Sequence, residues 1–166
     1  MMSEVTMFAK VPMRSPVGQL VVTASPVGVV SIEFGSSAGG APVGSAPAVA
    51  SQIAQLGVEQ LGEYFAGRRR SFDLALDLRG TPFQLLAWGA LMRIPFGVTL
   101  TYGQQAAAIG RPTAARAVGS ANGRNPIPIV VPCHRVVGAD SRLGGYSSGR
   151  DVKRALLALE GVNGVA

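Results

Sequence analysis

Short runs of apolar residues, each bounded by turn residues, mark the first half of the chain. Residues 17–24 and 28–34 are rich in aliphatic and β-branched side chains, and Ser25-Pro26-Val27-Gly28 between them favours a hairpin turn. Residues 72–78 alternate between apolar and polar positions, which predicts a third strand. These patterns predict a small antiparallel sheet.

A loop and a helix are expected between the second and third of these strands. Residues 35–47 are mostly Gly, Ala, Ser and Pro, a composition that favours a flexible loop. Residues 49–65 predict a helix, with apolar positions at Val49, Ile53, Leu56, Leu61 and Phe65. The first half is therefore predicted to be a small α+β domain.

The second half is patterned as a series of helices. Thr81-Pro82-Phe83-Gln84 supplies a capping hydroxyl, a proline in the first turn and the glutamine of a capping box, so a helix is expected to begin here. Residues 94–97, Ile-Pro-Phe-Gly, are expected to end it. Its core face is predicted to contain Phe83, Ala87, Ala90, Leu91 and Ile94, and Trp88 is interpreted as a packing residue.

Two shorter helical patterns follow, at residues 102–109 and 113–122. Gly110-Arg111-Pro112 separates them, and Thr113 is the expected cap of the second. Helix, short turn and helix is the outline of a helix-turn-helix, a DNA-binding motif. The alternative is an Ala-rich helix buried against its neighbours. A last helix is expected after a loop at residues 142–149, with Ser148-Gly149-Arg150-Asp151 as its capping box and Val152, Leu156 and Leu159 on one face.

Composition narrows the class of protein. The chain has 166 residues, 48% of them hydrophobic, which is enough for one domain or two small ones with a buried core. No apolar run reaches the length of a membrane span, and the first residues lack the pattern of a signal peptide, so a cytoplasmic protein is expected. One cysteine and one histidine exclude an internal disulfide framework and a four-ligand Cys/His zinc site.

The net charge of +6 is unevenly distributed. Residues 1–80 contain six basic and six acidic side chains, whereas residues 81–166 contain nine basic and three acidic ones and so hold the whole excess. Most of these cations are arginines, whose planar guanidinium suits phosphate. A polyanionic partner and a charge that serves solubility both remain open.

The only thiol and the only imidazole of the chain are adjacent, at Cys133 and His134, directly after an apolar run that ends at Pro132. An imidazole can lower the pKa of a thiol or accept its proton, which makes the sulfur nucleophilic. The alternative is a structural cysteine beside a surface histidine. Glu160 lies in the last turn of the final helix, where it opposes the helix dipole. Holding a histidine is one explanation for it, and an ordinary exposed glutamate near a helix end is the other.

A set of ordered motifs in residues 81–161 resembles the O6-alkylguanine-DNA alkyltransferase family. The motifs are Thr81-Pro82-Phe83-Gln84 through Trp88, Ile94-Pro95-Phe96-Gly97, Tyr102-Gly103, Ala115-Arg116-Ala117-Val118-Gly119, Asn125-Pro126, Ile129 through the signature Pro132-Cys133-His134-Arg135 to Gly138, and Gly145-Tyr146 to Glu160-Gly161. Residues 1–80 match in outline, through Ser15-Pro16-Val17-Gly18 and the strand pattern.

The resemblance implies a fold and a function. It implies a ribonuclease-H-like α+β domain at residues 1–80, followed by a mainly α, winged-helix-like domain at residues 81–166 with a helix-turn-helix. Such a protein enters the minor groove of double-stranded DNA, flips O6-methylguanine or O4-methylthymine out of the duplex, and transfers the alkyl group irreversibly to its own cysteine. It acts once, without a cofactor, as a monomer in solution, and cooperative binding on DNA is left open. The zinc site that some members carry in the first domain is not expected, because residues 1–80 lack Cys and His.

The resemblance also implies roles for individual residues. Cys133 is the nucleophile, His134 takes its proton through a water, Glu160 orients the imidazole, Tyr102 donates to the departing guanine oxygen, and Asn125 holds the turn before the cysteine. Arg116 fills the space left by the flipped base. The other expected DNA contacts are Thr113, Ala114, Ala117, Ser120, Tyr102 and Arg135. The expected base pocket comprises Pro128, Val136, Tyr146, Ser147 and Ser148, and the last of these, often glycine in relatives, bears on the tolerance of bulky adducts.

Two other functions compete with this hypothesis. A DNA-binding module that recognises alkylguanine without repairing it is one, and Cys133 argues against it because tryptophan replaces the cysteine in such relatives. A Cys-His hydrolase is the other. It would need repeated turnover and an oxyanion hole, and it would leave the arginine excess unexplained.

Overall fold

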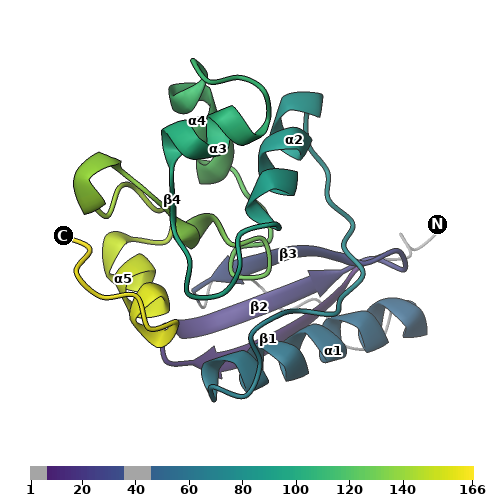
Figure 1. Cartoon of the computed structure of the whole chain (residues 1–166). Helices are drawn as coiled ribbons and strands as arrows, with labels where there is room; N and C mark the ends of the chain where they lie inside the picture. The colour runs from purple at the N-terminus through teal and green to yellow at the C-terminus, as the bar shows by residue number, and fades with distance from the viewer. Residues whose placement is uncertain (1–6, 36–45) are drawn as a thin grey trace. The chain divides into compact units, whose positions relative to one another are not determined.

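The computed structural model describes residues 7–35 and 46–166, so the expected loop at residues 35–47 lies almost entirely outside the described residues. The chain divides into two compact units, of which the first ends at Leu78 and the second begins at Arg79. Figure 1 draws the first unit in purple to blue and the second in teal to yellow. Each unit has its own hydrophobic core.

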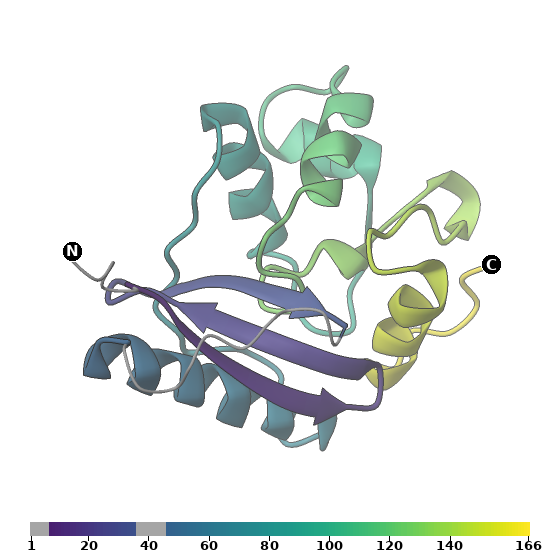
Figure 2. The ribbon, with the colours of Figure 1, turned by 180° about the vertical axis from the view of Figure 1, so that it is seen from behind.

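The first unit is a three-stranded antiparallel sheet with one helix. The strands are β1 (Ala9–Ser15), β2 (Gly18–Ala24) and β3 (Val29–Phe34), in the order β1-β2-β3. The helix α1 (Ala48–Phe65) runs along one face of the sheet, as both ribbon views show (Figures 1 and 2). The tight turn at residues 25–28 is confirmed, since the Ser25 amide donates to the Gly28 carbonyl at 2.9 Å. The predicted α+β class of this domain is confirmed.

Two strand assignments differ from the sequence-based ones. Strand β1 was not expected; it carries Pro12, which an edge strand tolerates because one side of its backbone needs no partner. The predicted strand at residues 72–78 is wrong: the segment is described, and only Leu76 forms a bridge, parallel to Val29. Period-two alternation there reflects a segment held beside β3 by hydrogen bonds from the Val29 amide to Ala75 and from the Asp77 amide to Val29.

Helix α1 buries a different face from the one that its large apolar residues predict. Val49 and Leu56 are 52% and 43% exposed, whereas Ala54 and Gly57 are buried. A Cβ atom on Gly57 would lie 3.1 Å from the Val22 side chain, so the helix approaches the sheet too closely for large residues. Small residues, completed by Leu61 and Tyr64, therefore form the interface.

The second unit is mainly helical, as predicted. Its elements are α2 (Pro82–Leu91), β4 (Leu100–Thr101), α3 (Tyr102–Ala108), α4 (Ala115–Gly123), the 3-10 turn η1 (Cys133–Arg135), β5 (Val136–Val137), the 3-10 turn η2 (Ala139–Ser141) and α5 (Arg150–Leu159). The two short strands pair in parallel. No helix in the described ranges is long and apolar enough to cross a membrane.

Helices α2, α3 and α4 are locked together by polar contacts in their shared core. The predicted capping box of Thr81 and Gln84 is confirmed, and Thr101 and Gln104 form a second one at the start of α3. Trp88 is buried as predicted, and its indole N–H donates to the Ala121 carbonyl in α4 at 2.9 Å. The Gln105 and Asn122 side chains exchange two amide hydrogen bonds, of 2.9 and 2.7 Å, between α3 and α4. These contacts fix the predicted helix-turn-helix.

The predicted starts of α4 and α5 are wrong in their capping. Helix α4 begins at Ala115, and no described side chain caps it, so Thr113 is an exposed turn residue. Helix α5 begins after Gly149, which has a positive φ of 105°. The expected capping box of Ser148 and Asp151 is not formed, since the described residues show no side-chain capping bond there. The buried face of α5 is also displaced, to Lys153, Leu156 and Leu157.

The first unit offers a test of how tightly the segment at residues 72–78 is packed. A Cβ atom on Gly28 would lie 2.7 Å from backbone atoms of Ala75 and Leu76, so Gly28→Ala should lower the free energy of unfolding by about 1–3 kcal/mol. Gly62→Ala is the matched control: a Cβ there meets nothing within 4 Å, and removing a helical glycine should raise stability by about 0.5–1 kcal/mol. Urea denaturation measures both. A Gly28→Ala protein as stable as the wild type would contradict this packing.

Candidate active site

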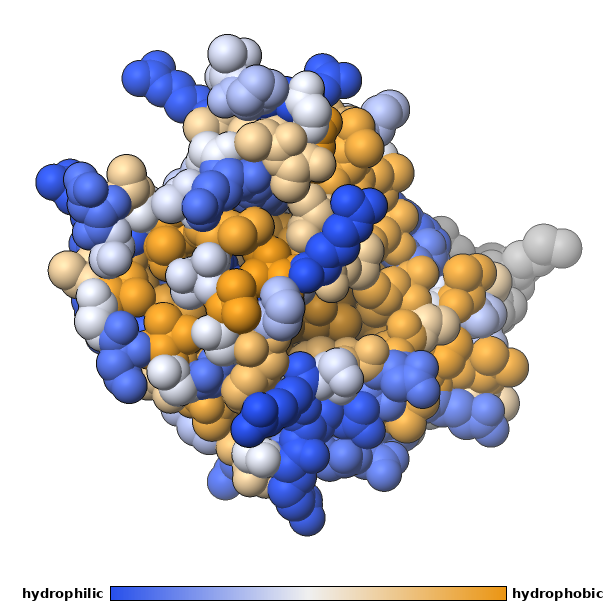
Figure 3. All heavy atoms as spheres, in the orientation of Figure 1, coloured by the Kyte–Doolittle hydropathy of each residue, from blue (hydrophilic) through white to orange (hydrophobic). Residues whose placement is uncertain are grey.

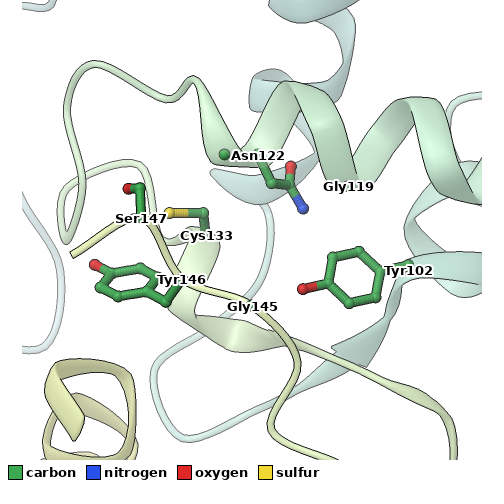
Figure 4. Close-up of a pocket in the computed structure, with 8 residues that line it drawn as sticks. Tyr102, Gly119, Asn122, Cys133, Gly145, Tyr146 and Ser147 are labelled. Carbon is green, nitrogen blue, oxygen red and sulfur yellow. The ribbon is translucent and has the colours of Figure 1, made fainter. Parts of the chain in front are cut away.

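One pocket of about 350 Å³ opens in the second unit. Figure 4 shows its residues, which come from the start of α3, from α4, from η1 and from the loop before α5: Tyr102, Gly119, Asn122, Gly123, Cys133, Gly145, Tyr146 and Ser147. The Tyr102 hydroxyl points into this space (Figure 4). A volume of this size lies within the range of about 300–1,000 Å³ that is usual for small-molecule sites.

Glycines keep the wall beside Tyr102 open. Gly144 has a φ of 75°, and a Cβ atom there would lie 2.9 Å from the Tyr102 hydroxyl. A Cβ atom on Gly119 of α4 would lie in ordinary van der Waals contact with the same ring, at 3.6 Å. Burial raises the pKa of the Tyr102 phenol. Its hydroxyl therefore stays protonated at neutral pH and can donate a hydrogen bond into the pocket.

Cys133 is held at the pocket by a tight turn that Asn125 organises. The Asn125 side chain donates to the Val131 carbonyl at 2.7 Å and accepts from the Ile127 amide at 3.0 Å. Ile129, within this turn, has a φ of 74°, a left-handed conformation that costs about 1–3 kcal/mol in a non-glycine residue and persists only where its surroundings enforce it. The predicted positioning role of Asn125 therefore has a geometric basis.

The thiol of Cys133 is only 6% exposed. Burial raises its pKa, while a hydrogen bond with Asn125 and the positive charge of Lys153 act in the opposite direction. The sulfur thus rests as a thiol at neutral pH. It needs a proton acceptor before it can act as a nucleophile.

His134 and Glu160 meet in the interior of the second unit. The His134 Nε2 atom lies 2.6 Å from the Glu160 carboxylate, and the imidazole is fully buried. Burial lowers the pKa of His134, and this outweighs the opposing effect of Glu160. Because a carboxylate can only accept, Nε2 carries the proton of the neutral ring. The other nitrogen, Nδ1, has no hydrogen-bond partner among the described residues and is free to accept a proton.

The side chain of Arg135, which was predicted to contact DNA, lies inside the second unit. It is 6% exposed, and its guanidinium pairs with Glu160, at 2.7 Å from Nε to Oε1. A further bond of 2.6 Å runs from Nη1 to the Ile94 carbonyl. In this structure the guanidinium is therefore occupied by partners inside the unit.

Lys153 is a buried cation that the sequence analysis missed. Its ammonium donates to the carbonyls of Val136, at 2.6 Å, and Gly145, at 3.1 Å, and so joins the segment after Cys133 to the pocket loop. Burial lowers its pKa to about 8. Its spacing from Leu156 and Leu157 on α5 is the one signal that could have placed it on the core face.

The expected DNA-contacting residues of the helix-turn-helix lie on and just before α4. Arg116, Thr113, Ala117 and Ser120 are exposed, and Ala114 is half-buried. Figure 3 shows hydrophilic side chains at the end of the second unit that carries α3 and α4. The exposed Arg111, between α3 and α4, and the exposed Arg124, directly after α4, were not predicted as contacts.

The expected base pocket agrees with the cavity only in part. Tyr146 and Ser147 line it, but Pro128, Val136 and Ser148 are not among its described lining residues. Pro128 and Val136 are buried. Asn122, Gly119 and Gly123 of α4 line it without having been predicted. The two glycines carry no chemical signal in a sequence. In the described ranges, no group of three or more His, Cys, Asp or Glu side chains could hold a metal ion.

Comparisons with known proteins match both units. Models of 6-O-methylguanine DNA methyltransferase match residues 10–78, as its ribonuclease-like domain, and residues 82–162, as its DNA-binding domain. A crystal structure of Mycobacterium tuberculosis OGT in complex with DNA is 44% identical, with a TM-score of 0.79, over 92% of this chain and 91% of that chain. The chain belongs to the 6-O-methylguanine DNA methyltransferase family. The resemblance and the fold class predicted from the sequence are confirmed.

Curated relatives in this family share one segment of the chain at high identity. A methylated-DNA–protein-cysteine methyltransferase of Mycolicibacterium paratuberculosis is 62% identical over 103 residues, which are 62% of this chain and 62% of the relative. The constitutive enzyme of that name from Bacillus subtilis is 52% identical over 106 residues, 63% of this chain and 64% of the relative. The aligned segments thus span less than two thirds of these relatives.

The positive charge of Lys153 should have a measurable effect on the pKa of the Cys133 thiol. Lys153→Met removes a cation that favours the thiolate, so the pKa of Cys133 should rise and its alkylation by iodoacetamide should need a pH about one unit higher for half-maximal rate. Mass spectrometry reads the rate without ambiguity, because the chain has one cysteine. Lys10→Met, at the only other lysine, is the control and should leave the profile unchanged. A Lys153→Met profile at the wild-type pH or below it would show that this charge does not act on the sulfur.

Proposed function

We propose that this family member repairs DNA by transferring the alkyl group of O6-alkylguanine, and by the same chemistry of O4-methylthymine, to its own Cys133. The observation that carries the proposal is the placement of the only cysteine on a pocket wall, next to a buried neutral imidazole that Glu160 holds. The matched curated relatives bear the name of this activity. No cofactor is part of the proposal.

The reaction follows from the groups around the pocket. Cys133 gives its proton to Nδ1 of His134 through a bridging water, and the sulfur attacks the alkyl carbon. The carbon–oxygen bond breaks, its electron pair goes to the guanine oxygen, and Tyr102 donates a hydrogen bond to that oxygen as negative charge develops. The base regains a proton equivalent to the one that the thiol lost. The products are unmodified guanine and a thioether, which has no leaving group at neutral pH, so each molecule acts once.

The burial of the thiol determines how the base must arrive. A sulfur that is 6% exposed cannot reach an atom inside a base stack, so the alkylated nucleotide has to leave the duplex and enter the pocket. We propose that α4 approaches the minor groove and that its exposed Arg116 fills the vacated space. Thr113, Ala114, Ala117 and Ser120 are the proposed contacts beside it. One chain holds all of these residues, so a monomer suffices, and chromosomal DNA as substrate implies a cytoplasmic location.

The transfer itself is tested by the mass of the intact protein. After incubation with duplex DNA that carries one O6-methylguanine, the protein should gain one methyl group in place of a hydrogen, with one equivalent of DNA repaired per molecule. Cys133→Ala should bind the same duplex and gain no mass. DNA binding by the wild type without any mass change would favour a recognition module, and repeated turnover on acyl substrates would favour a hydrolase.

The proposed insertion of Arg116 predicts a difference between duplex and single-stranded substrates. Arg116→Ala should slow single-turnover transfer from duplex DNA about tenfold or more, because unstacking a base costs a few kcal/mol and each 1.4 kcal/mol is worth a factor of about ten. Transfer from single-stranded DNA, in which the base is already unstacked, should change little. Arg93→Ala, at an exposed arginine just after α2, removes the same charge as a control. Equal losses on both substrates would contradict insertion.

A further inference from the structure

The guanidinium of Arg135 is held by hydrogen bonds on all three of its nitrogen atoms. Its Nε and Nη2 atoms donate to both oxygens of Glu160, at 2.7 and 3.2 Å, and its Nη1 atom donates to the Ile94 carbonyl at 2.6 Å. The guanidinium also lies 5.9 Å from the centre of the Phe96 ring. The side chain is thus fixed on a carboxylate that already holds the catalytic imidazole.

The Glu160 carboxylate therefore binds two basic groups, His134 and Arg135, with one negative charge. One oxygen accepts from His134 and from Arg135, and the other accepts from Arg135 and from the Gly97 amide at 3.2 Å. If Glu160 faced His134 alone, its negative charge would raise the pKa of the imidazole further than it does beside Arg135. With the guanidinium in place, the pair of Arg135 and Glu160 is already neutral. A proton on His134 would then add an uncompensated buried charge.

The other charged groups around the imidazole act in the same sense. Glu160, the residue directly after α5, contacts the ring, Lys153 of α5 acts on it through its charge, and Arg135 and Cys133 belong to η1 with it. Both cations, together with burial, lower the pKa of His134, and Glu160 alone raises it. No titratable group of the described residues other than Glu160 stabilises a proton on the ring.

We propose that Arg135 is a positioning residue for the transfer reaction: by neutralising Glu160, it lets the carboxylate orient His134 while keeping the imidazole uncharged and able to accept the proton of Cys133. The effect of Arg135 on alkyl transfer rests on the proposed function, whereas its contacts with Glu160 do not. From the sequence, Arg135 was predicted to contact DNA. The competing explanation is that Arg135 merely ties η1 to the end of α5.

The protonation of His134 tests this directly, because the chain has one histidine and its imidazole signals need no assignment. Nuclear magnetic resonance of the ¹⁵N-labelled ring, followed across a pH range centred on the ordinary value of about 6.5, gives its pKa in the intact protein without DNA. The wild-type imidazole should stay uncharged well below that value. Arg135→Gln should raise the pKa of His134 by about 1–3 units.

Two further variants separate charge from packing. Arg135→Lys keeps a positive charge but loses the bidentate fork, so the pKa of His134 should stay near its wild-type value. Arg154→Gln removes an exposed arginine of α5 that pairs with Asp151 at 3.4 Å, and it should leave the titration unchanged. The inference is overturned if wild-type His134 is protonated at or above the ordinary pKa, if Arg135→Gln leaves its titration in place, or if Arg135→Lys raises it as much as Arg135→Gln does. Should Arg135→Gln fail to fold, the wild type and Arg135→Lys decide.

The same variants connect the titration to the reaction. The rate of methyl transfer from single-stranded DNA should fall on the acid side with the pKa of His134, and this fall should move to higher pH in Arg135→Gln by the shift that the resonance experiment gives. If the pKa of His134 rises in Arg135→Gln while the acid-side fall of the transfer rate stays at its wild-type pH, the link to catalysis is overturned. If the wild type transfers no methyl group at all, the proposed function fails, and the resonance titration still decides the role of Arg135.

Discussion

The buried carboxylate of Glu160 is the constraint on which the rest of the site depends. It stands at the end of α5 and accepts hydrogen bonds from His134, from Arg135 and from the Gly97 amide, so that it joins three segments distant in sequence. A buried charge is tolerated only when its partners are complete, and here they are complete only if η1 and the loop after α2 take their observed positions. The orientation of the imidazole, and with it the proposed chemistry of Cys133, follows from that requirement.

Local signals in the sequence predicted a large part of the fold. The capping box at Thr81 specifies where α2 begins, and the turn at residues 25–28 specifies a hairpin, because a few adjacent residues determine each. The failures concern contacts made at a distance. Strand β1 contains Pro12 and charged residues and is recognisable only beside β2, and the small residues of α1 form its buried face only because the sheet comes so close.

The site shows the same division. Cys133, His134 and Glu160 could be named from a motif and from an oddly placed carboxylate, and the structure places the last two 2.6 Å apart. Arg135 and Lys153 could not be placed correctly, since a charged residue is expected at the surface unless its partners are known. Those partners lie 25 and 17 residues away, at Glu160 and at the Val136 carbonyl. The glycines and Asn122 that shape the pocket were missed because their contribution is space and backbone geometry.

The proposed function explains why these cations are buried rather than exposed. In the proposed reaction the site draws on charges fixed in advance: Lys153 favours the thiolate of Cys133, and Arg135 favours the neutral form of His134. The most direct measurement is a crystal structure of the Cys133→Ala protein with duplex DNA containing O6-methylguanine. We predict the modified base in the pocket, its methyl carbon toward residue 133 and its O6 atom within hydrogen-bonding distance of Tyr102. A base still stacked in the duplex, with the pocket empty, would contradict the account.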